Sequence, residues 1–340
     1  MSEKVHLWTK NKSATLKDVA LDVGVSESLV SFVLNGSRSG ARVSEETRML
    51  IVEAGSRLGY RPNALARSLN TGRTERLGVY SSRARIDARN MFFADLIGGI
   101  SERARETGMN VVIHASGDGT KKLLDLVSNR AIDGLLVYAA HNDPILRFLG
   151  QLVVPAVALA DKIESLPSAV VDDKGGGTLQ AQHLWQLGHR HVLLKQSNMT
   201  PSSARDRMLG FAETAEGLGM TLSWSYEEPL VPEGVNSDDV ALLTRRQNRA
   251  TALVGWHDAT AEAACHKLTS LGISIPGDVA VVGFDGFTKM FAPKYELTTI
   301  CAHWDRVGYS AAKTLTDMIE GKRAPEVTVQ PVDFVRGKTT

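Results

Sequence analysis

Residues 14–69 constrain this 340-residue chain more than any other stretch, because they read as short helices joined by a tight glycine turn. Thr15 is a suitable N-cap, and Asp18 stands where its capping-box partner is expected. The apolar face of this first helix comprises Leu16, Val19, Ala20 and Val23. Gly24 ends the helix, and Ser26 caps a second one. The inner side of the second helix comprises Val30, Val33 and Leu34. This pattern predicts a helix-turn-helix, whose second helix enters the major groove of DNA.

The opposite side of that second helix carries the candidate base-reading residues. They lie at i, i+1, i+4 and i+5: Glu27, Ser28, Ser31 and Phe32. Polar side chains at these positions can reach base edges, and the Phe32 ring can pack on a thymine methyl group. An ordinary surface helix of a small bundle is the alternative for this stretch alone.

A third helix and a short linker helix follow. The third begins at a Ser44 cap and runs to about Leu58, before Gly59. Its expected inner face comprises Leu50, Ile51, Ala54 and Leu58. Asn63 then caps a short segment that ends near Leu69. Isolated helices of fewer than about 12–15 residues are marginal in water, so this segment needs a partner such as a DNA minor groove.

Together these motifs resemble the lactose/galactose repressor family of transcription regulators. The matching residues are Thr15–Ala20, Gly24–Ser26, Val30-Ser31, Val33–Gly36, Val43-Ser44, Glu46–Arg48, Leu58–Ala64 and Ala66–Leu69. The resemblance implies that Leu69 wedges into the central base step of an operator, and that Asn63, Ala66 and Asn70 lie near the minor groove. The full set of DNA-binding residues expected is Thr15, Ser26, Glu27, Ser28, Ser31, Phe32, Asn35, Tyr60, Asn63, Ala66, Leu69 and Asn70. Phe32 departs from the polar or basic residue that many members carry there.

Charge and cysteine usage agree with a DNA-binding front end on a cytoplasmic protein. Residues 1–76 hold 12 of the 39 Lys and Arg and 8 of the 38 Asp and Glu, which makes this segment +4 and the remainder −3. The two isolated cysteines argue against a disulfide framework. No signal peptide and no membrane-spanning apolar run are present, so we expect no membrane partner. We expect residues 1–13 to be a flexible tail.

From Leu77 onward, short apolar strands alternate with amphipathic helices, which predicts α/β architecture with parallel sheets. We expect two doubly wound subdomains of the periplasmic-binding-protein-like type, with a ligand cleft beyond the strand ends. The expected division is a helix-turn-helix domain at 14–61, a hinge helix and linker at 62–76 and an effector-binding, dimerising core at 77–340. Within the core, subdomain 1 covers about 77–172 plus 303–324, and subdomain 2 about 173–302 plus 325–340. The resemblance implies these repeated crossings.

Candidate effector contacts follow several strands. They are Asn90, Phe92, Phe93, Arg207, Trp256, His257, Asp258 and Asp285. Aromatic rings offer apolar stacking, while a guanidinium and carboxylates make paired hydrogen bonds, which suits a sugar or related polyol; a nucleoside is the second choice. The resemblance implies effector contacts at Arg207 and Asp285, and His257 stands where the family often has Asn. The alternative for Arg207 and Asp285 is a structural ion pair.

Two further motifs point less clearly to a ligand. His189 and His191 form a His-x-His pair without a third metal ligand at a recognisable spacing, so a structural turn is favoured and no metal is expected. Gly175–Gly177 opens a helix but lacks the rest of a phosphate-binding fingerprint, which favours close helix packing. No cofactor site is expected.

The combined expectation is a transcription regulator, most simply a repressor, and no enzyme. It would bind a palindromic operator as a homodimer and respond to a small effector. Three other classes stay open from the residues: a regulator controlled by a phosphorylated protein partner, a sugar-binding protein without a DNA role, and an α/β enzyme.

Overall fold

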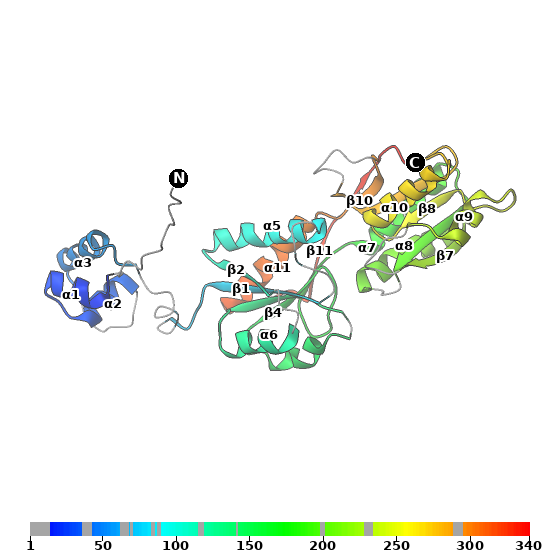
Figure 1. Cartoon of the computed structure of the whole chain (residues 1–340). Coiled ribbons are helices and arrows are strands. Elements are labelled where there is room, and N and C mark those ends of the chain that lie inside the picture. Colours follow the sequence, from blue (N-terminus) through cyan, green and yellow to red (C-terminus); the bar gives the residue numbers. More distant parts are fainter. Residues whose placement is uncertain are drawn as a thin grey trace, which may run out of the picture. The chain divides into compact units, whose positions relative to one another are not determined.

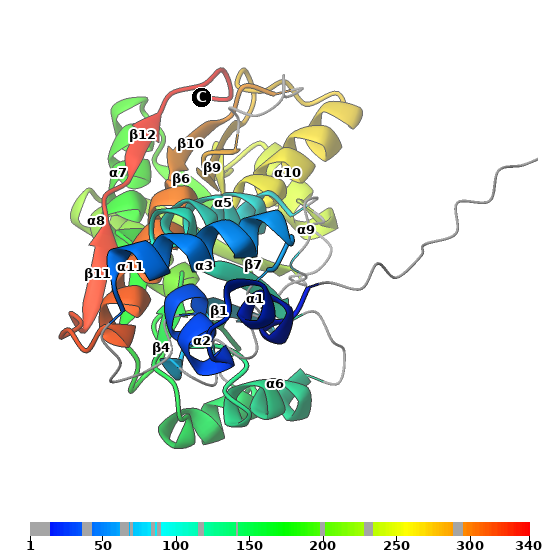
Figure 2. The same cartoon turned by 90° about the vertical axis from the view of Figure 1, so that its left-hand side faces the viewer.

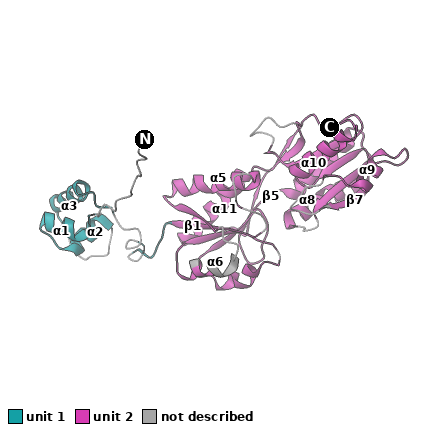
Figure 3. Ribbon diagram, in the orientation of Figure 1, with its two compact units in different colours: residues 1–75 teal, residues 76–340 magenta. Residues whose placement is uncertain are grey.

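The computed structural model describes residues 14–35, 43–61, 68, 71–82, 86, 90–114, 119–140, 142–197, 201–227, 234–287 and 295–340. The chain divides into two compact units, residues 1–75 and 76–340 (Figures 1 and 3). The expected tail at 1–13 and most of the expected hinge helix at 62–70 lie outside the described residues.

The first unit is a bundle of α1 (Leu16–Val23), α2 (Glu27–Asn35) and α3 (Glu45–Arg57). Thr15 and Asp18 form the predicted capping box, and Gly24 closes α1 with a left-handed φ of 74°. The core of the bundle comprises Val19, Ala20, Val30, Ile51 and Ala54. The prediction that Leu50 lies on the inner face of α3 is wrong. Leu50 is 51% exposed, because α3 turns Ile51, Ala54 and Gly55 inward.

The second unit holds two six-stranded sheets. Sheet A has the order β11-β5-β4-β3-β1-β2, and sheet B has the order β12-β10-β9-β8-β6-β7. All pairings are parallel except that of β12 with β10. The strands of sheet A are β1 (Arg76–Ser81), β2 (Asn110–His114), β3 (Gly134–Tyr138), β4 (Ala156–Leu159), β5 (Ser168–Val171) and β11 (Val327–Gln330). Those of sheet B are β6 (His191–Ser197), β7 (Thr221–Glu227), β8 (Ala252–Gly255), β9 (Ala280–Asp285), β10 (Thr298–Cys301) and β12 (Asp333–Val335).

Helices cover both faces of each sheet, as the alternating pattern predicted. The sheet-A half has α5 (Met91–Glu106) and α11 (Trp304–Ile319) on one face, and α6 (Gly119–Ser128) and the 3₁₀ segment η1 (Pro144–Gln151) on the other. The sheet-B half has α7 (Asp173–Gln186) and α8 (Ser202–Gly217) on one face, and α9 (Ser237–Thr244) and α10 (Asp258–Ser270) on the other. Figure 2 shows α7 and α8 across sheet B from α10. None of the helices described in these ranges is long and apolar enough to cross a membrane.

The chain crosses between the halves three times. It leaves sheet A after β5, returns after β10 and leaves again after β11. Adjacent crossings are bonded: Asp172 N donates to Gln330 O at 2.9 Å, and Cys301 pairs with Asp333. Because β11 pairs with β5, the last crossing falls at residues 331–332, later than the boundary at 325 expected from the sequence.

Candidate nucleic-acid interface and effector site

The second helix of the bundle presents a polar side to solvent. The Ser26 hydroxyl accepts a hydrogen bond from Leu29 N at 3.3 Å and bonds Ser28 Oγ at 2.9 Å, which starts α2. Glu27 and Ser28 are exposed, and Ser31 and Phe32 are half-buried. Phe32 is not among the described side chains that pack on the bundle core. The base contact of its ring stays a prediction.

Two predicted DNA contacts have a partner inside the bundle. Asn35 is only 5% exposed, and its Nδ2 donates to the Tyr60 hydroxyl at 3.2 Å. This bond joins the end of α2 to Tyr60, three residues beyond the end of α3. Thr15 likewise serves as the cap of α1. The hinge candidates Asn63, Ala66, Leu69 and Asn70 lie outside the described residues.

Arg207 is held in place by groups other than Asp285. It lies on α8, and its Nε and Nη2 donate to Asp173 Oδ1 at 3.2 and 2.9 Å, while Nη1 donates to Trp256 O. Its guanidinium stands 3.3 Å from the centroid of the Phe284 ring. Burial raises the pKa of Asp173 to about 7, although Arg207 opposes the shift. Asp173, the first residue of α7, was missed from the sequence; its place directly after a buried strand was the available signal.

Asp285 ends β9 in a strained conformation. Its φ is 139° and that of Gly286 is 82°, which places both in the region that favours glycine. Trp304 Nε1 donates to Asp285 Oδ1 at 3.2 Å. Burial raises the pKa of Asp285 well above its usual range, the Arg207 charge opposes this shift, and nearby Asp258 adds to it. Trp304 was also missed from the sequence.

Asp258 uses its carboxylate to hold the turn after β9. Its Oδ2 accepts from the backbone N of Gly286 at 2.9 Å and of Phe287 at 3.2 Å, and its Oδ1 accepts from Thr299 Oγ1. Burial raises the pKa of Asp258 to about 6. These bonds give Asp258 a structural task at the site: it shapes the turn that presents Asp285.

His257 caps α10 and stacks on Trp256. Its Nδ1 accepts from Thr260 N at 3.0 Å, and the two rings are 3.8 Å apart. Burial lowers the pKa of His257 to about 3, and the Arg207 charge adds to this, so the ring is neutral at pH 7. A neutral ring is consistent with a cap that accepts a backbone hydrogen bond.

The two aromatic candidates of the sheet-A half, Phe92 and Phe93, differ in burial. Phe93 is 1% exposed in the core of this half. Phe92 is half-buried and lies edge-on to Trp304, with ring centroids 4.8 Å apart. Asn90 occupies the N-cap position of α5 and makes no side-chain cap bond. Phe92 is thus linked through Trp304 to Asp285, across the two halves.

A cavity of about 100 Å³ lies beside Asp173, the partner of Arg207. Its polar lining comprises Asp161, Lys162, Asp172, Asp173, Lys174, Ser202, Ser203 and Asp206. The predicted effector residues do not line it, but Asp173 belongs to both the cavity and the Arg207 pair. Lys162 Nζ bonds Asp206 at 3.0 Å, so residues of both halves close this cavity.

The two motifs of unclear role have structural partners. His189 Nδ1 bonds Thr251 Oγ1 at 2.8 Å, and His191 bonds Asn248 O and Ser223 Oγ. No metal-binding group of three or more His, Cys, Asp or Glu occurs among the residues that the structure describes. Gly177 permits close approach of α7 to α8, because a Cβ there would overlap the backbone of Arg207 and Phe211.

Comparison with known proteins gives the same organisation. Residues 15–63 match the family of bacterial regulatory proteins of the lacI family, and residues 181–340 match a periplasmic binding protein-like domain. The HTH-type transcriptional repressor PurR of Haemophilus influenzae (strain ATCC 51907 / DSM 11121 / KW20 / Rd) is 30% identical over 319 residues, which cover 91% of this chain and 92% of that protein. PurR of Glaesserella parasuis serovar 5 (strain SH0165) is 29% identical over 317 residues, covering 90% of each.

Solved structures agree over nearly the whole chain. The lac repressor dimer bound to operator and the anti-inducer ONPF has a TM-score of 0.80 at 25% identity, covering 96% of this chain and 99% of that one. The complex of the regulator CelR with cellobiose has a TM-score of 0.68 at 26% identity, covering 96% and 100%. The resemblance predicted from the head-piece motifs is confirmed, and so is the predicted fold class. The chain belongs to the lacI family of bacterial regulatory proteins.

Proposed function

We propose that the chain is a cytoplasmic repressor that binds a near-palindromic operator as a homodimer, and that a sugar or related polyol changes its operator affinity. The observation that carries the effector proposal is that Trp304 bonds Asp285 at the end of β9 and that the Arg207 charge acts on the same carboxyl. Parallel strands place their carboxyl ends at one edge of the sheet, where ligands of such folds bind. Similarity to a regulator solved with cellobiose supports the same ligand class.

The chemistry of this group suits a neutral, hydroxyl-rich ligand. Phe92, which is half-buried, offers a ring surface for the apolar face of a sugar, and the buried Trp304 ring packs edge-on behind it. Asp285 offers a carboxyl that accepts from Trp304 Nε1, and burial raises its pKa, which makes it easier to protonate than an exposed carboxylate. Arg207 is positioned by Asp173 and Trp256 O. A ligand that binds one arrangement of the two halves better than another would shift operator affinity.

Homodimerisation is supported by the edge strands. Within the two sheets as described, β2 pairs only with β1, and β7 pairs only with β6. Ile113 of β2 is 41% exposed, and Trp224 and Tyr226 of β7 are 44% and 53% exposed. Apolar side chains on unpaired edges are surfaces for self-association. A two-fold dimer presents two reading helices to two half-sites.

Operator binding is tested by selection of duplexes from a random pool with the purified full-length protein. We expect a palindromic consensus that is bound on the order of a thousandfold more tightly than scrambled duplexes. Its affinity should fall steeply with added salt, because phosphate contacts release counterions. Selection with Phe32→Arg serves as the matched arm: altered half-site bases indicate that Phe32 faces the groove. Equal affinity for scrambled and selected duplexes refutes the proposal.

The effector site is tested with Asp285→Asn, because Asn keeps the oxygen that accepts from Trp304 Nε1. Sugars, sugar phosphates and nucleosides are screened by thermal shift, and each hit is titrated against operator binding. We expect Asp285→Asn to retain operator affinity without ligand and to lose the ligand's effect on it. Glu320→Gln, an exposed change at the C-cap of α11, is the control. A normal ligand response in Asp285→Asn would rule this site out and leave operator binding untouched.

A further inference from the structure

The two cysteines of the chain have opposite surroundings. Cys265 lies on α10, is fully buried in the core of the sheet-B half, and burial raises the pKa of its thiol to about 12. Cys301 is the last residue of β10, at a crossing between the halves, and is 6% exposed. A buried thiol without a base is inert, whereas a thiol beside a base can react.

Cys301 has such a base. His303 Nδ1 stands 3.7 Å from Cys301 Sγ, and His303 Nε2 stands 2.6 Å from Asp333 Oδ2. Since the carboxylate only accepts hydrogen bonds, it selects the tautomer with the proton on Nε2, which leaves the Nδ1 lone pair toward the thiol. A nucleophile, a base and a group that orients the base are the three parts of an activated thiol.

The backbone at His303 adopts an unfavourable conformation that brings the three side chains together. His303 has a left-handed φ of 49°, which a residue with a Cβ rarely adopts, and it makes no side-chain cap bond to α11, the helix that it precedes. Its ring instead reaches Cys301 and Asp333. Asp333 opens β12 and is the antiparallel partner of Cys301. The hydrogen bond of His303 with Asp333 therefore joins two crossings of the chain.

Cys301 also lies against the turn that presents Asp285. It is the parallel partner of Asp285, and a Cβ added to Gly286 would stand 2.9 Å from Cys301 Sγ. The backbone N of Gly286 is bound by Asp258. An atom added to the sulfur on the side of Gly286 would therefore press on this turn.

We propose that Cys301 is a modification site for small electrophiles and hydroperoxides, with His303 as its base and Asp333 as the residue that positions His303. His303 Nδ1 takes the thiol proton, and the sulfur attacks one peroxide oxygen. An S–O bond forms as the O–O bond breaks, and the leaving hydroxide or alkoxide takes the proton from His303. The sulfur is oxidised by two electrons to a sulfenic acid, and the peroxide is reduced to water or an alcohol.

The small exposed fraction of Cys301 selects the size of the reagent. Hydrogen peroxide is close to water in size, and Asp333 beside the thiol has a side chain that is 70% exposed. A bulky disulfide reagent has to displace this side chain or the turn at Gly286. Modification should therefore be fast with peroxide and iodoacetamide relative to larger thiol reagents.

The experiment uses the full-length protein, with iodoacetamide or hydrogen peroxide as the probe and intact and peptide mass spectrometry as the readout. We expect one thiol of the folded protein to react, at Cys301, at least about tenfold faster than Cys265. Cys265→Ser should keep the reaction, and Cys301→Ser should abolish it. Reaction of both thiols at one rate, or no reaction at Cys301 before unfolding, overturns the proposal.

The base is tested with His303→Gly, because glycine suits the positive φ and leaves a space for added imidazole. We expect labelling of Cys301 to slow by about tenfold or more and to recover with imidazole. Asp333→Asn should slow it less, and Asp333→Glu should recover part of the rate. Unchanged labelling in His303→Gly, or a loss that imidazole does not restore, refutes the role of His303. His303→Gln repeats the test with the side-chain volume kept.

The labelling needs neither DNA nor effector, so its failure is distinct from failure of the proposed function. A second measurement joins the two. After peroxide treatment in the Cys265→Ser background, we expect the effector-dependent change of operator affinity to be altered, since the added oxygen faces the Asp285 turn. The Cys265→Ser/Cys301→Ser protein is the matched control and should be insensitive to peroxide. The same response in both proteins would contradict this coupling.

Discussion

In the sheet-A half, α5 and α11 lie against each other through Gly99 and Gly308, and in the sheet-B half α7 and α8 do so through Gly177 and Gly210. A Cβ at any of these four positions would overlap backbone atoms of the facing helix. Both halves thus bring two helices into backbone contact on one face of the sheet. Because the two halves share this packing, the burial of their ion pairs can be compared directly.

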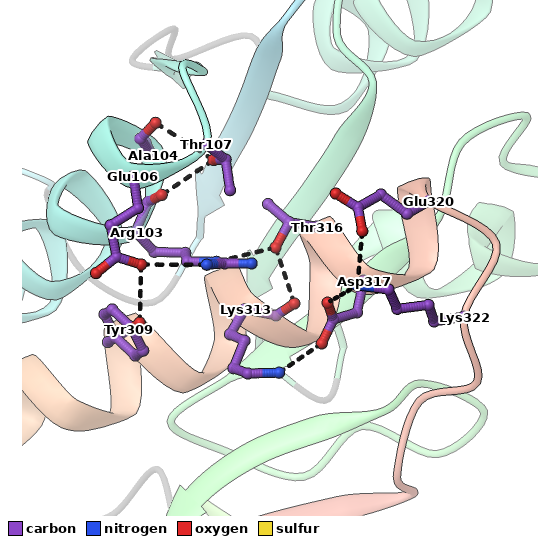
Figure 4. A network of polar contacts seen from close by, with 10 residues as sticks. All are labelled: Arg103, Ala104, Glu106, Thr107, Tyr309, Lys313, Thr316, Asp317, Glu320 and Lys322. Atoms are coloured by element: carbon purple, nitrogen blue, oxygen red, sulfur yellow. Dashed lines mark hydrogen bonds and ion pairs between the residues drawn. The ribbon is translucent and has the colours of Figure 1, made fainter.

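Among the described residues, the enclosed ion pairs lie in the sheet-B half, which also has exposed pairs such as Lys174 with Glu213. On α5, Arg103 bonds Glu106. At the end of α11, Asp317 bonds both Lys313 and Lys322, whose side chains are 56% and 59% exposed (Figure 4). In the sheet-B half, two pairs are enclosed: Lys195 with Asp239 at 2.8 Å, and Arg207 with Asp173 at 2.9 Å.

We expect the exposed ion pairs to contribute little to stability and the enclosed pairs to be required for it. An exposed pair exchanges protein partners for water at little cost, whereas an enclosed charge has no alternative to its partner. The enclosed pairs also reach the strand ends: Arg207 Nη1 donates to Trp256 O, and Trp256 N donates to Lys195 O. The sheet-B half therefore ties its buried charges to the candidate effector site.

The largest expected effect comes from removing one buried partner. Lys195→Met should lower the free energy of unfolding of the full-length protein by about 3–5 kcal/mol, because Asp239 would be left 3% exposed without its cation. Urea unfolding measures the change. Lys313→Met is the matched control on α11 and should change it by less than about 1 kcal/mol. Similar losses in both variants would erase the contrast between the halves.

The next largest effect is expected from the close helix contact that each half has, α5 with α11 and α7 with α8. Gly99→Ala and Gly177→Ala should each destabilise by about 3 kcal/mol, the upper end for overpacking, because the added methyl meets backbone rather than a movable side chain. Gly98→Ala, one residue earlier on α5, has nothing within 4 Å of its new Cβ and should stabilise by up to about 1 kcal/mol. A stable Gly99→Ala with a normal unfolding midpoint would disprove the close contact in the sheet-A half.

A smaller effect depends on acid. Because the pKa of His257 is lowered to about 3 in the folded chain, the unfolded chain binds the proton first, and stability falls as pH drops below the ordinary value near 6.5. The loss should reach about 2 kcal/mol at pH 5. His257→Asn keeps a side-chain acceptor for the α10 cap and removes this dependence. Equal slopes of unfolding free energy against pH in both proteins would show that His257 is free to charge.

Much of the fold could be predicted because local signals agree with burial. Thr15 with Asp18, Gly24 and Ser44 mark the bundle helices within a residue of where they lie. The stretch from Phe92 to Thr107, before Gly108, also reads as one helix in the sequence, and α5 lies within one residue of it at Met91–Glu106. The prediction for Leu50 was wrong because helical spacing alone fits two neighbouring faces of α3. Only packing against α1 and α2 determines that Ile51, and not Leu50, is buried.

The site was harder to predict because its pairings are tertiary. Arg207 and Asp285 follow different strands, and sheet order brings them near each other, but the first residue of α7, Asp173, takes the guanidinium. Trp304 reaches Asp285 only because α11 returns to the sheet-A half directly after β10. The sequence around Arg207 or Trp304 does not indicate which residue each one bonds.

The smallest expected effect lies in the exposed network of Figure 4. Hydrogen bonds from Lys313 and Lys322 lower the pKa of Asp317, so its stabilising contribution is present above the ordinary carboxyl pKa and is lost as pH falls. Asp317→Asn should cost about 0–1 kcal/mol at low ionic strength, and added salt should reduce this cost, since exposed pairs are screened. Lys195→Met should keep its cost in salt, because its partner is enclosed. A loss in Asp317→Asn that is large and salt-independent would mean that α5 and α11 depend on their surface charges as much as the sheet-B half depends on its buried ones.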